Sequence, residues 1–314
     1  MNIIFLGNFH VDFSSENHHK KSLESLGHKV IPLQEGVVNA DVIMAHCINA
    51  DLLIWVHTHG WNTPNGVTFS REDILSTLKS IGIPSLTYHL DLWLGIARQK
   101  DLDEDPFYKD IEHFFTVDKL MADWFNKNTK VKGHYIPAGV FGEECKMLEP
   151  NQEPMNDVIF VGSRGYHPEW KWRPTLIDWL AETYGDKFKH FGGDGIKIVR
   201  GHELNQLYAN TKVVVGDSLV LNFDYPYYWS DRVYETMGRG GFLLMPNIAG
   251  LENEFELGVE LDTFEFGNFY NIKKQIDFYL KNNELREVMR KNGHNKVKNN
   301  YTYKHRWETI LNQI

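Results

Sequence analysis

The chain has 314 residues, of which 42% are hydrophobic and 24% are charged, and its net charge is −9 at pH 7. The length allows two domains of ordinary size, and the composition is typical of a soluble globular protein. Most of the negative charge lies in residues 1–150. This excess argues against non-specific binding to duplex nucleic acid, because such binding needs a basic face.

The cysteine pattern, the first residues and the lengths of the apolar runs together predict a cytoplasmic protein. Cys47 and Cys145 form neither a CxxC pair nor a zinc-binding spacing, which favours a reducing compartment and no metal cluster. Residues 1–13 lack the basic start and long apolar core of a signal peptide. No run approaches the roughly 20 apolar residues needed to span a bilayer.

Alternating strands and helices are predicted through the first 150 residues. Apolar runs indicate strands at 2–7, 28–33, 51–57, 83–88, 113–117 and 134–137. Helices are expected at 15–26, 70–81 and 119–127, where capping residues and glycines mark the ends. This alternation predicts a parallel, doubly wound sheet.

The same alternation restarts after a polar, proline-containing linker at 148–156. Strands are expected at 157–162, 188–191, 213–216 and 241–245, and helices at 168–184, 202–209, 271–280, 284–299 and 303–314. We therefore predict two α/β domains, 1–150 and 151–314, that face an interdomain cleft. Ligands of such sheets bind at the carboxyl ends of the strands.

The segment 227–246, YYWSDRVYETMGRGGFLLMP, carries the most informative pattern. Ser230 or Asp231 can cap a short helix, which is followed by a glycine turn and a buried strand. Glu235 lies one turn into that helix, where a core needs no carboxylate. The alternative is a surface ion pair between Arg232 and Glu235, which are three residues apart.

This segment resembles the nucleotide-sugar half of the group 1 glycosyltransferases, in particular the CgeB-like branch. The matching residues are Ser230, Arg232, Tyr234, Glu235, Gly238, Gly240 and Gly241. The resemblance implies the GT-B fold, with two Rossmann-like domains, and implies that Glu235 holds the ribose hydroxyls of the donor. A carboxylate suits this role because it accepts two hydrogen bonds at once. Related families hold the sugar with a further Glu, at the position of Tyr227 here.

The resemblance also implies an activity. A hexose or pentose would pass from a nucleoside-diphosphate sugar, with UDP favoured, to an acceptor hydroxyl, without a bound metal or other cofactor. The C-terminal domain would bind the donor and the N-terminal domain the acceptor.

A strand that runs into a small-residue turn, Gly162–Ser163–Arg164, is the second donor-side motif. Backbone N–H groups in such a turn can approach an anion, and Arg164 adds a positive fork, with Lys171 nearby. The alternative is an ordinary strand-to-helix turn. The GxGxxG fingerprint is absent, which argues against a nicotinamide cofactor. The candidate donor-binding residues are Gly162, Ser163, Arg164, Lys171, Gly193, Ser230, Arg232, Glu235 and Gly240.

The candidate catalytic residues, His89 and Asp91, follow the strand at 83–88. A histidine or a tuned carboxylate at a strand end can act as general base, and the sequence leaves open which of the two does so. The alternative is structural, with Asp91 capping the next helix. Candidate acceptor-side residues are His10, Asp12 and His59.

Two further patterns suggest metal binding but are given other interpretations. His57 and His59 form a His-x-His pair without a third ligand at a recognisable spacing, so lining of the acceptor site is preferred. The acidic run 101–106, DLDEDP, is interpreted as solvated charge.

Two other functions remain open. The acceptor could be a hydroxymethylated pyrimidine in DNA, since similar chains of tailed bacteriophages add sugars to modified bases. Alternatively, the chain could bind a nucleotide sugar without turnover.

Overall fold

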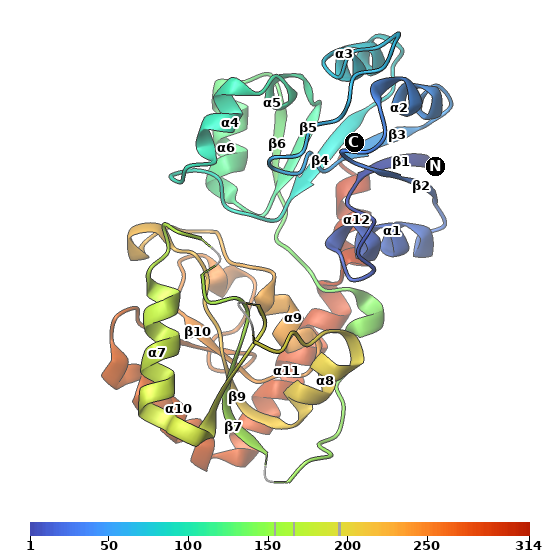
Figure 1. The fold of residues 1–314 in the computed structure, drawn as a ribbon. Coiled ribbons are helices and arrows are strands. Elements are labelled where there is room, and N and C mark those ends of the chain that lie inside the picture. Colours follow the sequence, from blue (N-terminus) through green and yellow to red (C-terminus); the bar gives the residue numbers. More distant parts are fainter. Residues whose placement is uncertain (154, 166, 194–195) are drawn as a thin grey trace. The chain divides into compact units, whose positions relative to one another are not determined.

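The computed structural model describes residues 1–153, 155–165, 167–193 and 196–314 (Figure 1). The chain forms two compact units. The first unit comprises Met1–Pro137 and Tyr303–Ile314, and the second comprises Ala138–Thr302.

The first unit is built on a six-stranded parallel sheet with the strand order β2-β1-β3-β4-β5-β6. Its strands are β1 (Asn2–Gly7), β2 (Lys29–Gln34), β3 (Leu52–Trp55), β4 (Ser85–His89), β5 (His113–Thr116) and β6 (Lys132–Tyr135). Every residue of β3, β4 and β5 is buried, as expected for inner strands covered on both faces. The parallel α/β fold predicted for this half is confirmed.

Seven helices of the first unit lie within the described residues. They are α1 (Ser15–Ser25), α2 (Ala40–Cys47), α3 (Asp73–Ser80), α4 (Gln99–Glu104), α5 (Phe107–Asp110), α6 (Lys119–Asn128) and α12 (Tyr303–Leu311). Helices α2, α4 and α5 were not predicted. Helix α2 begins at a good capping residue, because the Asn39 side chain accepts the Val42 N–H at 3.0 Å.

The C-terminal helix α12 belongs to the first unit, whereas the predicted division at residue 150 placed it in the second. It packs beside α1 (Figure 1). Its buried face carries Tyr303, Trp307 and Ile310, and the Trp307 Nε1–H donates to His19 Nδ1 at 3.0 Å. This aromatic face finds its partners near the start of the chain, which explains why local sequence did not reveal the arrangement.

The second unit holds a five-stranded parallel sheet with the order β11-β10-β9-β7-β8. Its strands are β7 (Asn156–Val161), β8 (Phe188–Phe191), β9 (Thr211–Val215), β10 (Leu243–Pro246) and β11 (Asp262–Phe264). Its α-helices are α7 (Trp172–Tyr184), α8 (Gly201–Ala209), α9 (Arg232–Gly238), α10 (Phe269–Lys281) and α11 (Asn283–Asn300). The predicted elements of this half are present, and β11 is an addition.

Each sheet has one point at which the strand order reverses. In the first unit the chain leaves β1 toward β2 on one side and returns with β3 on the other. In the second unit the corresponding neighbours are β7 and β9. Loops diverge at such points and leave a crevice at the carboxyl ends of the strands, which is where α/β sheets bind ligands.

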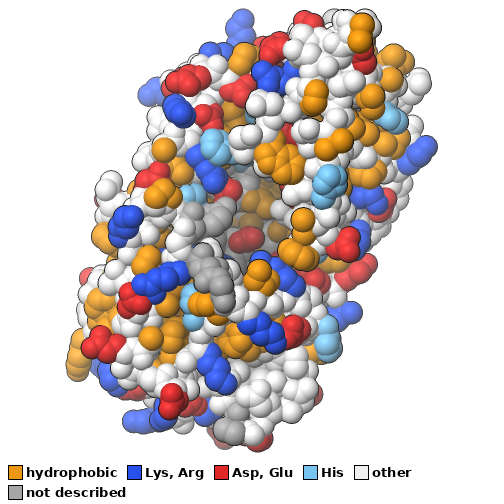
Figure 2. Space-filling view, in the orientation of Figure 1, with side chains coloured by type: hydrophobic (Ala, Val, Ile, Leu, Met, Phe, Trp, Pro, Cys, Tyr) orange, Lys and Arg blue, Asp and Glu red, His pale blue; other side chains and the backbone are white. Residues whose placement is uncertain are grey.

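The face in Figure 2 shows Lys and Arg side chains interspersed with Asp and Glu and with hydrophobic side chains. No helix of the described residues is long and apolar enough to cross a membrane.

Candidate functional site

Two arginines, the buried Arg173 and the partly buried Arg232, meet the buried Asp217 where β7 and β9 diverge. Arg173 Nε lies 2.8 Å from Asp217 Oδ2, and Arg232 Nη1 donates to the Asp217 backbone carbonyl at 3.2 Å. The side chain of Asp217 is fully buried. We call Arg173, Asp217 and Arg232 the arginine site.

The two arginines of the arginine site bind different groups of Asp217. Burial raises the pKa of Asp217, which the guanidinium of Arg173 opposes, and burial beside Arg173 lowers the pKa of Arg232. Asp217 Oδ2 also accepts the Trp170 Nε1–H at 2.9 Å, whereas its Oδ1 has no hydrogen-bond partner within the described part of the chain. Arg173 pairs with the Asp217 carboxylate, whereas Arg232 bonds the Asp217 backbone carbonyl, so the guanidinium of Arg232 is suited to a further anion.

Glycines bring the turns of this unit close to the arginine site. Gly162 has φ +145°, and a Cβ there would lie 2.4 Å from Arg232 Nη2, so only glycine lets the guanidinium reach the turn after β7. Arg173 Nη1 donates to the Ser163 carbonyl at 3.3 Å. Gly193 has φ +77° and packs against Ser163, where an added Cβ would lie 3.1 Å from the serine Cβ. The structure therefore brings Gly162, Ser163, Gly193 and Arg232 together. They meet near the carboxyl ends of the strands, where ligands of such sheets bind.

Arg164 and Lys171 lie elsewhere in the structure. The Arg164 fork pairs with Asp178 on the exposed side of α7, with Nη1 at 2.6 Å from Oδ1. Lys171 is exposed just before α7. Arg173, which was not among the candidates, lies on the buried face of α7 in their place.

Glu235 pairs with Arg239, four residues later, while Arg232 points to Asp217. Arg239 Nε lies 2.6 Å from Glu235 Oε2, and the Arg239 side chain is 3% exposed. Arg239 also pairs with Glu144 and donates to Asn205 Oδ1 at 2.7 Å. The Glu235 carboxylate remains about one-fifth exposed, so it is fixed in place and still accessible.

The two remaining donor candidates, Ser230 and Gly240, have distinct surroundings. The Ser230 N–H donates to Ser218 Oγ at 3.1 Å, and the buried Ser230 Oγ has no hydrogen-bond partner among the described residues. Gly240 has φ +82°, and a Cβ there would press against Met147 at 2.8 Å, so this glycine serves the turn after α9. Of the glycine turn 191–195, residues 194 and 195 lie outside the described residues.

In the first unit, His89 and Asp91 have different environments. His89 is 7% exposed among aromatic rings, with its centroid 4.8 Å from Phe114 and 5.1 Å from Trp93. Burial, reinforced by nearby His57, lowers the pKa of His89 to about 3, so this ring is neutral near pH 7. Asp91 is more exposed, and its Oδ2 lies 3.3 Å from Arg98 Nη1.

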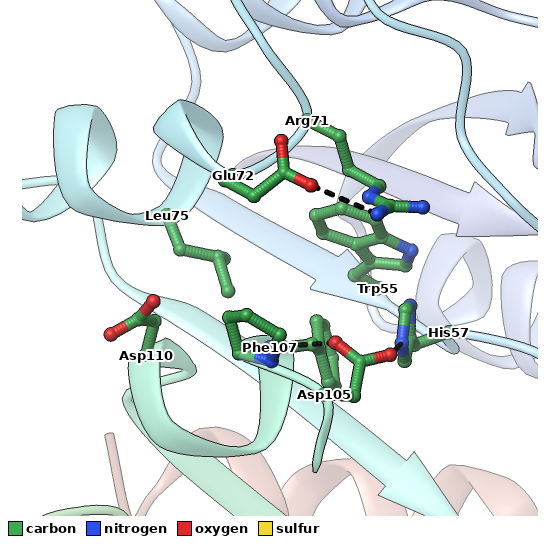
Figure 3. A pocket seen from close by; sticks show the side chains of 9 residues that line it. Trp55, His57, Arg71, Glu72, Leu75, Asp105, Phe107 and Asp110 are labelled. Carbon is green, nitrogen blue, oxygen red and sulfur yellow. Dashed lines mark hydrogen bonds and ion pairs between the residues drawn. The ribbon is translucent and has the colours of Figure 1, made fainter. Parts of the chain in front are cut away.

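His57 follows β3 and lies between two carboxylates, of which Figure 3 shows that of Asp105. Its Nε2 is 2.8 Å from Asp105 Oδ2, and its Nδ1 is 3.8 Å from Oε1 of the fully buried Glu35. Glu35 accepts hydrogen bonds from Trp55 Nε1 at 2.8 Å and from the Thr58 N–H at 2.9 Å, and burial raises its pKa. His57 has φ +54°, an unusual value for a non-glycine residue that often marks a functional site.

The ring of His57 stacks on Phe107, with the centroids 4.0 Å apart. Beside it lies a small pocket of about 20 Å³, enough for one water molecule. Trp55 and Leu75 contribute apolar surface, and Arg71, Glu72, Asp105 and Asp110 add charge (Figure 3).

The acidic run 101–106 is not simply solvated charge, and that interpretation was wrong. Asp101 Oδ2 lies 2.8 Å from His59 Nδ1, and Asp105 Oδ2 lies 2.8 Å from His57 Nε2. The two histidines of the His-x-His pair are thus each held by one aspartate of the run. No group of three or more His, Cys, Asp or Glu within the described residues could hold a metal ion.

The loop after β1 carries the remaining acceptor-side candidates. His10 and Asp12 are exposed there. Glu16, which was not predicted, is a partly buried carboxyl group at the start of α1, and its burial raises its pKa. A Cβ on Gly7 would lie 2.9 Å from Glu16 Cγ, so the Glu16 side chain crosses the end of β1. Glu16 and Glu35 could both have been found by asking which carboxylates follow a predicted strand.

Two parallel α/β units, each with a switch point at its carboxyl edge, define the fold as GT-B. The comparison with sequence families agrees, because residues 173–312 match the glycosyl transferase-like family. No curated protein matches the sequence.

Solved structures of similar fold include three that extend over nearly the whole chain. A glycosyltransferase from Rickettsia africae is 13% identical, with a TM-score of 0.62, over 99% of this chain and 97% of its own. HepE of Anabaena in complex with UDP-glucose is 13% identical, with a TM-score of 0.67, over 100% and 99%. An alpha-glucosyltransferase in complex with UDP and a 13-mer DNA containing an HMU base is 10% identical, with a TM-score of 0.70, over 100% and 98%.

Proposed function

We propose that this protein is a glycosyltransferase of the CgeB-like branch that transfers a hexose or pentose from a nucleoside-diphosphate sugar to an acceptor hydroxyl. The arginine site carries this proposal. At the switch point of the second sheet, the buried Arg173 pairs with the Asp217 carboxylate and the partly buried Arg232 bonds the backbone carbonyl of the same residue, so the guanidinium of Arg232 suits a diphosphate. The family match over residues 173–312 covers all three residues of this site.

UDP is the favoured nucleotide, since HepE and the alpha-glucosyltransferase were both solved with UDP or UDP-glucose. In the proposed complex, Arg173, Arg232 and the N–H groups of the Gly162–Ser163 turn stabilise the leaving diphosphate without a bound metal. Glu235, oriented by Arg239, accepts hydrogen bonds from the ribose hydroxyls. Ser230 and Gly193 belong to the same site, and Arg164 and Lys171 are outer candidates.

In this proposal the first unit binds the acceptor, and one of its side chains accepts the proton of the acceptor hydroxyl. The proposed location of the protein is the cytoplasm. Asp91 suits the general base better than His89 does, because its carboxylate is accessible whereas the neutral His89 ring is enclosed. His10, Asp12 and His59 are the proposed acceptor-side residues.

A second proposal concerns the acceptor. The alpha-glucosyltransferase was solved with DNA containing an HMU base, and its fold resembles this chain over its whole length. A hydroxymethylated pyrimidine in DNA is therefore an acceptor to test, by following transfer of labelled glucose from UDP-glucose to hydroxymethylated and unmodified DNA. Label on the modified DNA alone would support it, and label on neither would reject it. A nucleotide-sugar binding protein without turnover would bind UDP-glucose but release no glucose from it.

Calorimetric titration with UDP and uridine tests the donor site. We expect UDP to bind much more tightly than uridine, because only UDP reaches the arginine site. Saturation at 100 times the dissociation constant should add about 2.7 kcal/mol to the free energy of unfolding. Equal affinities for UDP and uridine, or no binding of either, would overturn the proposal.

A further inference from the structure

A cavity of the second unit lies at the carboxyl ends of β9 and β10. It has a volume of about 500 Å³, which is in the range of small-molecule sites. The loop after β9 and the loop after β10 line it with Val220, Phe223, Asp224, Tyr225, Asn247, Ile248, Ala249, Glu252 and Leu257. We call it the loop pocket.

The two loops that form the loop pocket are joined by a hydrogen bond and by close side-chain packing. The Tyr227 N–H donates to the Ala249 carbonyl at 2.8 Å. A Cβ on Gly250 would lie 2.2 Å from Tyr227 Cδ1, so the tyrosine ring occupies the space that only glycine leaves. Asn222, Phe223 and Tyr227 all have positive φ, between 54° and 63°. Such conformations persist only where the surrounding contacts enforce them. The packing of the two loops therefore fixes the shape of the loop pocket.

The lining of the loop pocket combines apolar and hydrogen-bonding groups. Val220 and Ile248 form a buried apolar part, and Phe223 is 53% exposed. Asp224 and Glu252 contribute carboxylates from different loops, and Asn247 contributes an amide. A ring with apolar C–H faces and many hydroxyls fits this set, because aromatic rings pack on its faces while carboxylates and amides bond its hydroxyls.

A single side chain links the loop pocket to the arginine site. Trp170 donates to Asp217 Oδ2 at 2.9 Å, and the centroid of the same indole lies 5.4 Å from that of Phe223. The indole of Trp170 therefore contacts both the arginine site and the lining of the loop pocket.

We infer that the loop pocket binds the glycosyl group of the donor and selects a neutral sugar over a uronic acid. The inference rests on the proposed function, since the arginine site must hold the diphosphate. Asp224 and Glu252 accept hydrogen bonds from sugar hydroxyls but repel the carboxylate of a uronate. This selection would come from the charge of the pocket rather than from its size.

Calorimetry with UDP, UDP-glucose and UDP-glucuronate tests this inference on the full chain. The wild type should bind UDP-glucose at least tenfold more tightly than UDP-glucuronate. Asp224→Asn and Glu252→Gln should each weaken UDP-glucose binding about tenfold, leave UDP binding unchanged and narrow the gap between the two sugars. The matched control is Glu182→Gln, on the exposed side of α7, which should change none of these affinities.

The outcomes distinguish a failure of the proposed function from a failure of the loop-pocket inference. If the wild type binds none of the three ligands, the proposed function falls together with the inference. If UDP binds but the two variants keep wild-type affinity for UDP-glucose and wild-type discrimination against UDP-glucuronate, the pocket inference alone is wrong. Equal losses for UDP and UDP-glucose in both variants would also overturn it, because the residues would then act on loop structure rather than on the sugar.

Discussion

His57 Nε2 lies 2.8 Å from Asp105 Oδ2, and this pair is matched by His59 Nδ1 and Asp101 Oδ2 at the same distance. The two pairs differ in burial, because the His57 side chain is 10% exposed and that of His59 is 46% exposed. His57 also lies beside the buried Glu35. The other hydrogen-bond donors to the Glu35 carboxylate among the described residues, Trp55 Nε1–H and the Thr58 N–H, are neutral.

We expect His57→Asn to lower the free energy of unfolding by about 1–3 kcal/mol, because it leaves buried polar groups without their partner. His59→Asn is the matched control and should cost less than about 1 kcal/mol, as exposed pairs do. Urea denaturation of both variants at pH 7 measures the difference. Equal costs would show that burial does not distinguish the two pairs.

A second prediction concerns pH and His19. Burial lowers the pKa of His19 from 6.5 to about 3, and its Nδ1 accepts the Trp307 hydrogen bond between α1 and α12. The unfolded chain therefore binds a proton at higher pH than the folded chain, so stability falls as the pH drops from about 6.5 toward about 3. At pH 5 the loss from this group should be about 2 kcal/mol relative to neutral pH.

His19→Gln keeps a hydrogen-bond acceptor for Trp307 but removes the titration, so this variant should lose about 2 kcal/mol less between pH 7 and pH 5. Urea denaturation at the two pH values measures it, with the exposed His202→Gln as control. An identical pH dependence in wild type and His19→Gln would contradict the assignment.

The sequence predicted the sheets well because inner parallel strands are continuous apolar runs. It also placed Gly162, Ser163 and Arg232 in one candidate donor site, since ligands of parallel sheets bind at the carboxyl ends of the strands. The sequence-based prediction named Arg164 and Lys171 rather than Arg173 because it relied on distance from the turn along the chain and not on the 3.6-residue period of the helix. Trp172, Arg173, Leu176 and Ile177 share the buried face of α7, and that spacing was visible in the sequence.

Other features depend on contacts between distant residues. Asp101 and Asp105 meet histidines 42 and 48 residues away, so an acidic run by itself reads as solvated charge. Helix α12 joins the first unit through an aromatic contact that spans 288 residues. Neither relation leaves a periodic or local signal, and both depend on the assembled sheet.

The third prediction tests the arginine site. Arg232→Lys keeps the charge but loses the planar fork, so it should weaken UDP binding by about 1.5–3 kcal/mol and leave uridine binding unchanged. Arg164→Lys is the matched change at a guanidinium that pairs with Asp178, and it should have a smaller effect on UDP. Calorimetry measures all four affinities. A larger loss of UDP binding from Arg164→Lys would instead place the diphosphate at Arg164.

The fourth prediction concerns Glu235. Glu235→Gln should weaken both uridine and UDP binding by about 1–3 kcal/mol, because the ribose is common to both ligands. This pattern differs from that of Arg232→Lys, which affects UDP alone. Unchanged affinity for both ligands would mean that Glu235 serves only its ion pair with Arg239.

The last prediction assigns the proton chemistry in the first unit. Asp91→Asn should reduce turnover of UDP-glucose by 10²–10⁴-fold, as expected for a lost general base, and leave UDP affinity unchanged. His89→Gln should act differently, because His89 is neutral and enclosed by Phe114 and Trp93. We expect it to lower stability by about 1–3 kcal/mol while turnover of the folded fraction falls less than tenfold. Single-turnover kinetics combined with urea denaturation separate these effects. If Asp91→Asn retains near-normal turnover while folded, the base lies elsewhere, and Asp12 and His59 are the next residues to replace.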